Sequence, residues 1–166
     1  MSKYKNYLIV GGAGQDAYFL TELLLKKKSK IYLLINRNFP KIKKNNKRIS
    51  IKKINIFSAK KVHNFLNKFK ELTIFFLASY NISTIEKESL EILNRNLLIN
   101  VNGLANFLEH ISKHNKKMKL FYACSSHIYN DTKTKLQNEN TKPIFNSNYG
   151  LAKYLGKETC DFYRTK

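Results

Sequence analysis

Residues 8–20 have the sequence LIVGGAGQDAYFL, in which an apolar run leads through a glycine-rich turn into a helix-like stretch. Gly11, Gly14 and Ala17 have the spacing G-x-x-G-x-x-A. Gly11 permits a tight turn, Gly14 lets a phosphate approach the backbone, and Ala17 lets the helix pack close to the strand. Backbone N–H groups and the positive end of the helix then hold the phosphate. The segment therefore predicts a site for the phosphates of a dinucleotide. A glycine-rich turn without a ligand is the alternative, and it explains the position between strand and helix less well.

The rest of the chain alternates apolar runs with amphipathic stretches, which is typical of an α/β fold with a parallel sheet. The predicted strands cover residues 7–10, 30–35, 49–56, 72–78 and 118–125. The predicted helices cover residues 18–27, 59–69, 90–114 and 149–163. The first helix has its apolar residues at Phe19, Leu20, Leu23 and Leu24, and the third has a predicted buried stripe of Leu93, Leu97, Val101, Leu104, Leu108 and Ile111. The prediction is a Rossmann-type, doubly wound parallel sheet of about five strands with flanking helices, in one dinucleotide-binding domain over residues 1–166.

A formal net charge of +20 raises the question of a nucleic-acid partner. The basic residues are scattered along the chain, and few of them are arginine, the better bidentate reader of phosphates. Lys, Asn, Ile, Tyr and Phe make up about half of the chain, and all five have A/T-rich codons. Genome composition therefore explains the charge, and we expect no nucleic-acid partner. A basic nucleic-acid-binding protein is the lesser alternative.

The N-terminal apolar stretch is short and runs directly into glycines, unlike a secretory leader. No apolar run is long enough to cross a membrane. These features predict a cytoplasmic protein without a membrane partner. Cys124 and Cys160 match no metal-ligand spacing, so we expect free thiols and no metal site.

The end of the second predicted strand indicates which dinucleotide binds. A site that prefers NAD usually has Asp or Glu there, accepting a hydrogen bond from the ribose 2′-OH. This sequence has Asn36 and Arg37 instead. The charge and planar fork of an arginine suit a 2′-phosphate, so we predict NADP, with NAD as the alternative.

Tyr149 and Lys153 are four residues apart on a predicted helix and therefore share one face. A phenol is a poor base at neutral pH, and a neighbouring ammonium favours its phenolate form. The pair Ser125-Ser126 follows the fifth predicted strand, where α/β folds place their ligands. The same spacing occurs on many solvated helices, and that is the alternative.

Together these residues resemble the extended short-chain dehydrogenase/reductases, the NAD-dependent epimerase/dehydratase family, and most closely its GDP-mannose 4,6-dehydratases. The resemblance covers essentially the whole chain. It is carried by the glycine loop with Gln15-Asp16, by Phe76-Leu-Ala-Ser79, by Asn100-Val-Asn-Gly103, by residues 121–130, and by residues 139–143 and 148–153.

The resemblance implies a sugar-nucleotide dehydratase or epimerase that uses NADP and acts on GDP-mannose or a similar substrate. Tyr149 would take a proton from a sugar hydroxyl, Lys153 would assist it and hold the nicotinamide ribose, and Ser125 would bind the same hydroxyl. The implied cofactor-binding residues are Gly11, Gly14, Gln15, Asp16, Arg37, Asn55, Ile56, Leu77, Ala78, Tyr149 and Lys153. Among them, Asn55 stands where relatives have an aspartate near the adenine.

The sequence departs from the dehydratases at His127, which stands where they have a catalytic glutamate. An imidazole can act as a base near neutral pH, so His127 is also a predicted catalytic residue, and epimerase or reductase chemistry stays open. Relatives are longer, with a C-terminal domain that binds most of the sugar nucleotide, so the resemblance implies a chain truncated before that domain. It also implies a homo-oligomer if that half is supplied. The alternative function is a non-catalytic NADP-binding fragment, or one half of a split enzyme.

Overall fold

A five-stranded parallel sheet forms the centre of the molecule, with the strand order β3-β2-β1-β4-β5. The computed structural model describes residues 4–36, 46–80, 89–129 and 136–166. The strands are β1 (Lys5–Val10), β2 (Ser29–Ile35), β3 (Ile49–Lys53), β4 (Thr73–Phe76) and β5 (Lys119–Tyr122). The chain runs outward from β1 to β3 and then crosses back to β4 on the other side of β1. The predicted Rossmann-type, doubly wound sheet is confirmed.

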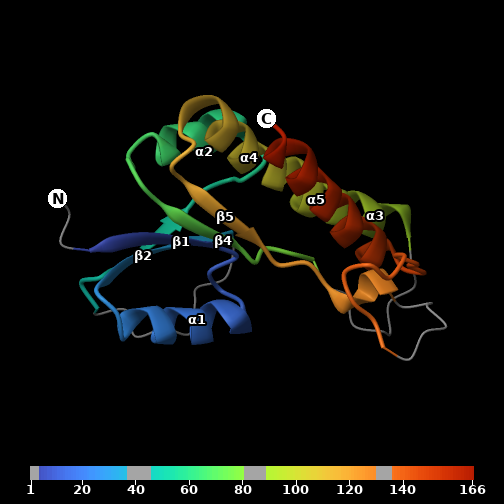
Figure 1. Cartoon of the computed structure of the whole chain (residues 1–166). Helices are drawn as coiled ribbons and strands as arrows, with labels where there is room; N and C mark the ends of the chain where they lie inside the picture. The colour runs from blue at the N-terminus through green and yellow to red at the C-terminus, as the bar shows by residue number, and fades with distance from the viewer. Residues whose placement is uncertain (1–3, 37–45, 81–88, 130–135) are drawn as a thin grey trace.

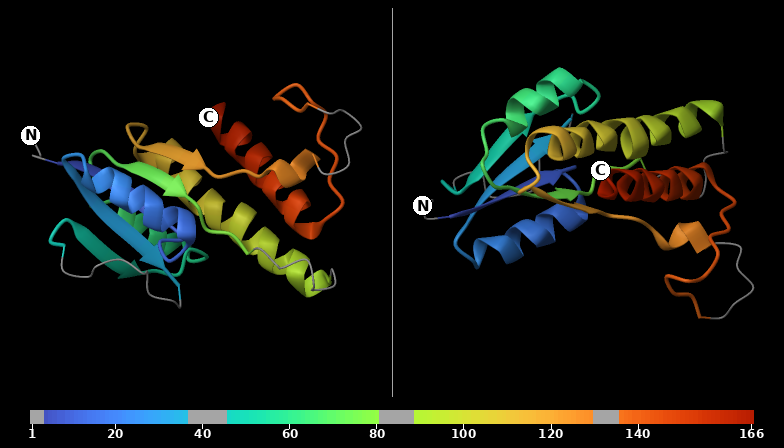
Figure 2. Two further views of the ribbon diagram at one scale, coloured as in Figure 1. Left: turned by 90° about the horizontal axis from the view of Figure 1, so that it is seen from below. Right: turned by 45° about the horizontal axis from the view of Figure 1, so that its top comes forward.

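The helices cover the two faces of the sheet unequally, as Figures 1 and 2 show. They are α1 (Gln15–Leu25), α2 (Ala59–Leu66), α3 (Leu90–Leu97), α4 (Leu104–His114) and α5 (Asn148–Arg164). In the described part of the chain, α1 lies alone on one face, and α2, α4 and α5 lie on the other (Figure 1). The helices α3 and α5 run side by side beyond the sheet (Figure 2). No helix among the described residues is long and apolar enough to span a membrane.

The core forms because successive strand residues point to opposite faces of the sheet. Leu8 and Val10 of β1 face one cluster, which includes Phe76 of β4 and Phe107 of α4. Ile9 faces the second cluster, which lies between the sheet and α1. Full burial of an aliphatic or phenylalanine side chain contributes about 1.5–3 kcal/mol, so these two layers fix the ends of the strands in place.

The predicted helix over residues 90–114 exists, but a π-helical segment, Leu98–Gly103, separates α3 from α4. A π-helical turn holds more residues than an α-helical turn and therefore rotates the faces that follow. The predicted buried stripe is wrong in part: only Leu104 and Leu108 of it are buried, whereas Asn96 and Asn100 are fully buried. The polar side chains of Asn96 and Asn100 bond to helix carbonyl groups four residues earlier.

Other boundaries and faces differ from the prediction in ways that local chemistry explains. The strand β3 ends at Lys53 because Asn55 accepts a hydrogen bond from the Phe57 N–H and turns the chain. The first helix begins at Gln15, directly after the turn. Its buried face is formed by Ala17, Thr21 and Leu24, whereas Phe19 and Leu23 are 60% and 54% exposed.

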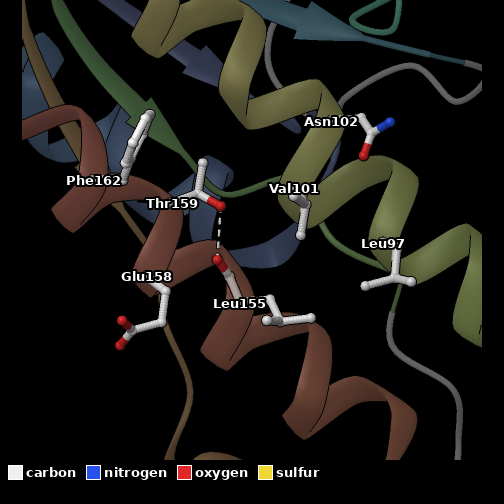
Figure 3. A pocket seen from close by; sticks show the side chains of 7 residues that line it. All are labelled: Leu97, Val101, Asn102, Leu155, Glu158, Thr159 and Phe162. Atoms are coloured by element: carbon white, nitrogen blue, oxygen red, sulfur yellow. Dashed lines mark hydrogen bonds between the residues drawn. The ribbon is translucent and has the colours of Figure 1, made fainter.

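A groove of about 420 Å³ runs between α5 and the helix formed by α3 and the π-helical segment (Figure 3). Apolar side chains from both helices line it, among them Leu97, Val101, Leu155 and Phe162. Leu155 and Phe162 are 37% and 56% exposed. The two predicted stripe residues Leu97 and Val101 therefore face this groove and not the sheet.

Candidate functional site

The glycine turn after β1 has the geometry that the motif predicts. Gly11 has a φ of +89°, a conformation that side chains rarely adopt. A Cβ atom at Gly11 would lie 2.7 Å from the backbone nitrogen of Ala78. A Cβ atom at Gly14 would meet only the carbonyl oxygen of Gly11, at 3.4 Å, so the space above Gly14 is open. Gly11 is therefore needed for the fold, and Gly14 leaves room for a ligand.

Gly14 is also the N-cap of α1, and no side chain caps this helix end. The first-turn N–H groups of α1 therefore keep the capacity to bind an anion. Gln15 and Asp16 lie in this first turn and are exposed. Gly12, which the motif did not single out, packs against β2, because a Cβ atom there would lie 2.7 Å from the Cβ atom of Leu33.

The turn lies at the point where the strand order reverses, between β1 and β4. The Leu77 N–H donates to the Val10 carbonyl over 2.9 Å, and Ala78 follows against Gly11. Ligands of open α/β sheets bind at such a switch point, beyond the carboxyl ends of the strands. The structure thus brings the predicted residues Leu77 and Ala78 to the glycine turn.

The structure describes two of the three residues predicted at the second and third strand ends, Asn55 and Ile56, and not the third, Arg37. Arg37 lies outside the described residues, directly after the exposed Asn36. Asn55 is exposed after β3, and its side-chain oxygen accepts from the Phe57 N–H over 3.0 Å. Ile56 packs toward Gly103, and its carbonyl accepts a 2.8 Å hydrogen bond from Asn106. The amide nitrogen of Asn55 is the group that can donate to a ligand.

Ser125 and His127 lie in a tight turn that follows β5. The Ser125 hydroxyl accepts a hydrogen bond from the His127 N–H over 3.2 Å, and a 3₁₀ turn, Ser126–Tyr129, follows. The His127 ring packs edge-on against the Tyr149 ring, with centroids 5.4 Å apart. Gly150 permits this approach, because a Cβ atom there would lie 2.7 Å from the His127 carbonyl oxygen.

Tyr149 and Lys153 lie on the first turns of α5, which Ser147 caps by accepting from the Gly150 N–H over 3.0 Å. The Lys153 ammonium lies 5.7 Å from the centroid of the Tyr149 ring. The predicted residues His127, Tyr149 and Lys153 therefore form one contiguous group. Tyr149 is half-buried and His127 is exposed, so both can meet a ligand.

Lys153 is 2% exposed, which is unusual for a lysine. Its ammonium donates a 2.7 Å hydrogen bond to the Ala123 carbonyl. Burial disfavours the charged form and lowers the pKa of Lys153 to about 8. A buried titratable group beside a phenol, at the carboxyl end of a parallel sheet, is typical of a functional site.

No group of three or more His, Cys, Asp or Glu side chains within the described ranges could hold a metal ion. Cys124 and Cys160 are free thiols. Burial raises the pKa of Cys160 to about 11. The described groups at the candidate site are backbone amides, hydroxyls, the side-chain amides of Gln15 and Asn55, the Asp16 carboxylate, the His127 imidazole and the Lys153 ammonium.

The family model of GDP-mannose 4,6 dehydratase matches residues 8–166 of this chain. The chain belongs to the GDP-mannose 4,6 dehydratase family. The match begins in β1 and includes the glycine turn and all of α5. No curated protein sequence matches the chain.

Solved structures of three enzymes share the fold of this member of the GDP-mannose 4,6 dehydratase family. UDP-glucuronic acid 4-epimerase from Bacillus cereus, in complex with NAD, superimposes with a TM-score of 0.79 at 20% identity and covers 97% of this chain and 52% of its own. The Bordetella bronchiseptica enzyme WbmG, in complex with NAD, gives 0.77 at 18% identity, covering 96% and 50%. Glucuronic acid dehydrogenase from Chromohalobacter salexigens gives 0.79 at 20% identity, covering 98% and 56%. The chain thus spans about half the length of the structures that it resembles.

Proposed function

We propose that this chain is the dinucleotide-binding part of a NADP-dependent sugar-nucleotide dehydratase or epimerase, with GDP-mannose or a similar nucleotide sugar as substrate. The observation that carries the proposal is the open glycine turn at the switch point, next to the uncapped start of α1. The NAD complexes of the structural neighbours support the binding of a nicotinamide dinucleotide, and the family match supports the class of enzyme.

The residues present fit a dinucleotide. Phosphate oxygens can approach the backbone at Gly14, where the nearest atom to an added Cβ is 3.4 Å away, and can accept from the first-turn N–H groups of α1. Arg37 would pair with a ribose 2′-phosphate, and Lys153 would donate to the nicotinamide ribose. When bound, the nicotinamide would accept and return a hydride at the sugar.

The chain's own groups would move the proton. Tyr149 would accept the proton of a sugar hydroxyl, and the Lys153 ammonium near its ring would stabilise the phenolate charge. Ser125 would hold the same hydroxyl by a hydrogen bond. His127 packs on Tyr149 and would serve as the base next to a new ketone, the role of the dehydratase glutamate. If His127 does not act, the chemistry is that of an epimerase or reductase.

The groove between α3 and α5 supports the proposal of a homo-oligomer, formed once the C-terminal half is supplied, in which a second copy of the chain packs on this face. Leu155 and Phe162 are seven residues apart on α5, as are Leu90 and Leu97 on α3, so each pair lies along one helix stripe. Two copies related by a two-fold axis would place each stripe against the partner groove.

Binding of NADPH and NADH, measured by titration calorimetry, tests the proposed cofactor. We expect NADPH to bind about tenfold more tightly, since Arg37 would pair with the extra phosphate. The variant Arg37→Ala should remove this preference, whereas Arg164→Ala, an exposed arginine on α5, should keep it. Equal affinities would refute NADP preference, and no binding of either dinucleotide would refute the proposed function.

A second experiment separates an enzyme from a non-catalytic binding fragment or one half of a split enzyme. The chain is mixed with NADP and GDP-mannose or another nucleotide sugar, and sugar products and reduced cofactor are followed by chromatography and absorbance. Conversion that Tyr149→Phe abolishes would support the enzyme. Tight NADP binding without conversion of any nucleotide sugar would favour the binding fragment or the half enzyme.

A further inference from the structure

Tyr122, the last residue of β5, lies in the contact between the sheet and α5 and was not among the predicted site residues. Its ring packs near Phe76, with centroids 6.2 Å apart. Burial raises the pKa of Tyr122 far above its ordinary value. Its hydroxyl therefore stays a neutral hydrogen-bond donor at any pH at which the protein works.

The hydroxyl of Tyr122 is anchored on the π-helical segment. It donates a 3.1 Å hydrogen bond to the side-chain oxygen of Asn100. Asn100 is itself fixed, because it is fully buried and its amide nitrogen donates to the Asn96 carbonyl over 3.1 Å. Gly156 of α5 leaves the space, since a Cβ atom there would overlap the Tyr122 hydroxyl and lie 2.7 Å from the Asn100 carbonyl oxygen.

The face of the Tyr122 ring meets the ammonium of Lys153, whose nitrogen lies 4.9 Å from the ring centroid. An aromatic face attracts a cation, most strongly where water is excluded. The titratable groups around this ammonium are Tyr122, Cys124 after β5, and Tyr149 on its own helix, and none of these is a carboxylate. Within the described part of the chain, the Tyr122 ring, the more distant Tyr149 ring at 5.7 Å and the Ala123 carbonyl offset the burial of the charge.

We propose that Tyr122 is a positioning residue for Lys153. The face of its ring attracts the ammonium, and its hydrogen bond to Asn100 holds the ring in place. The significance of this support for ligand binding rests on the proposed role of Lys153. The contact with the ring uses none of the three N–H donors of the ammonium, and Ala123 accepts from one of them, so donors are left for a ligand.

The pKa of Lys153, measured by NMR on protein with ¹³C-labelled lysine, tests the proposal directly. Lys153→Arg assigns the signal. Tyr122→Leu removes the ring face, and we expect the pKa of Lys153 to fall by about 1, whereas Tyr122→Phe keeps the ring and should leave it nearly unchanged. Phe107→Leu, a buried aromatic that packs on Phe76, is the control for general loosening of the core.

A fall in Tyr122→Leu, absent in Tyr122→Phe and Phe107→Leu, supports the proposal. An unchanged or raised pKa in Tyr122→Leu, or an equal fall in Tyr122→Phe or in Phe107→Leu, overturns it. If Tyr122→Leu does not fold, Tyr122→Met fills the space with a flexible apolar chain and is held to the same criteria.

Titration of the same samples with NADPH separates this proposal from the proposed function. We expect Tyr122→Leu to weaken NADPH binding several-fold and Tyr122→Phe to leave it close to that of the natural protein. If the unsubstituted chain binds no dinucleotide and the pKa of Lys153 still falls in Tyr122→Leu, the proposed function fails and the positioning role stands. If NADPH binds and the pKa does not fall, the positioning role fails alone.

Discussion

The ammonium of Lys153 donates a 2.7 Å hydrogen bond to the carbonyl oxygen of Ala123, which joins α5 to the end of β5. This contact places the nearly fully buried cation beside Ala123, which is two residues before Ser125, and the lysine itself is one helix turn after Tyr149. The candidate site thus depends on how α5 docks on the sheet.

Dinucleotide binding should depend on pH in the range where Lys153 titrates. Its pKa is about 8, so the ammonium is charged below that pH and neutral above it. We expect NADPH affinity to fall as the pH rises through about 8, and Lys153→Gln to remove this part of the dependence. Titration calorimetry in buffers on both sides of this pH checks it. A pH dependence that persists in Lys153→Gln would assign it to another group.

The free energy of unfolding should rise with pH over the alkaline range, whereas the NADPH affinity should fall. The pKa of Lys153 is lower in the folded chain than the 10.5 of an unperturbed lysine, so the unfolded chain binds more protons between about pH 8 and 10.5. The contribution of Lys153 therefore makes the free energy of unfolding rise with pH across this window. Urea denaturation of the natural chain and of Lys153→Met measures it, and the variant should lack that rise.

Substitution of Gly11 should mainly affect stability, and substitution of Gly14 should mainly affect ligand binding. Gly11→Ala forces a side chain to a φ of +89° and against Ala78, so we expect it to lose roughly 1–3 kcal/mol of stability. Gly14→Ala meets no close atom and should keep the melting temperature but weaken NADPH binding about tenfold. Thermal unfolding and calorimetry check both. A stable Gly11→Ala, or unaltered binding in Gly14→Ala, contradicts these roles.

The contact between Gly156 and Tyr122 should appear in a double-mutant cycle. Gly156→Ala places a methyl group on the Tyr122 hydroxyl and should cost roughly 1–3 kcal/mol. In a Tyr122→Phe background the same substitution should cost less, because the overlapping hydroxyl is gone. Urea denaturation of the four proteins gives the coupling energy. A coupling energy of zero would show that α5 adjusts without involving Tyr122.

The lowered pKa of His110 predicts that the folded chain loses stability in mild acid. Burial, and then the neighbouring His63 and His114, lower the pKa of His110. The unfolded chain therefore binds more protons below about pH 6.5, and stability falls as the pH drops below that value. His110→Leu should make this decline shallower, and Phe107→Leu, a buried position of the same helix without a titratable group, should not. Unfolding free energies across the acidic range check this, and equal slopes in all three proteins would refute it.

The second-copy proposal is tested by a charge placed on the groove. Phe162→Lys should shift the chain toward the monomer in sedimentation velocity, because the cation would be buried in the contact. Phe19→Lys replaces an equally exposed phenylalanine on α1 and should leave the distribution unchanged. If the natural chain is monomeric at all concentrations tested, the same comparison is made with the C-terminal half of a structural relative joined to it, and a monomer there would refute the proposed contact.

The sequence predicted the sheet, the glycine turn and the Tyr149–Lys153 pair, because these depend on local rules. Apolar runs of strand length, a glycine spacing and a four-residue helix repeat are visible within short windows. It did not predict the π-helical segment, nor that Asn96 and Asn100 are buried whereas Leu97 and Val101 face the groove. That register is set by contacts with α5 and β5, which are distant in sequence.

By itself, then, the sequence determined the order of the elements and which residue types meet at the carboxyl end of the sheet. Only the tertiary structure decided that Lys153 is buried with the Tyr122 ring and the Ala123 carbonyl around it. The physical reason is that the burial of a charge depends on groups from three separate elements: β5, α5 and the π-helical segment. No window of the sequence contains all three.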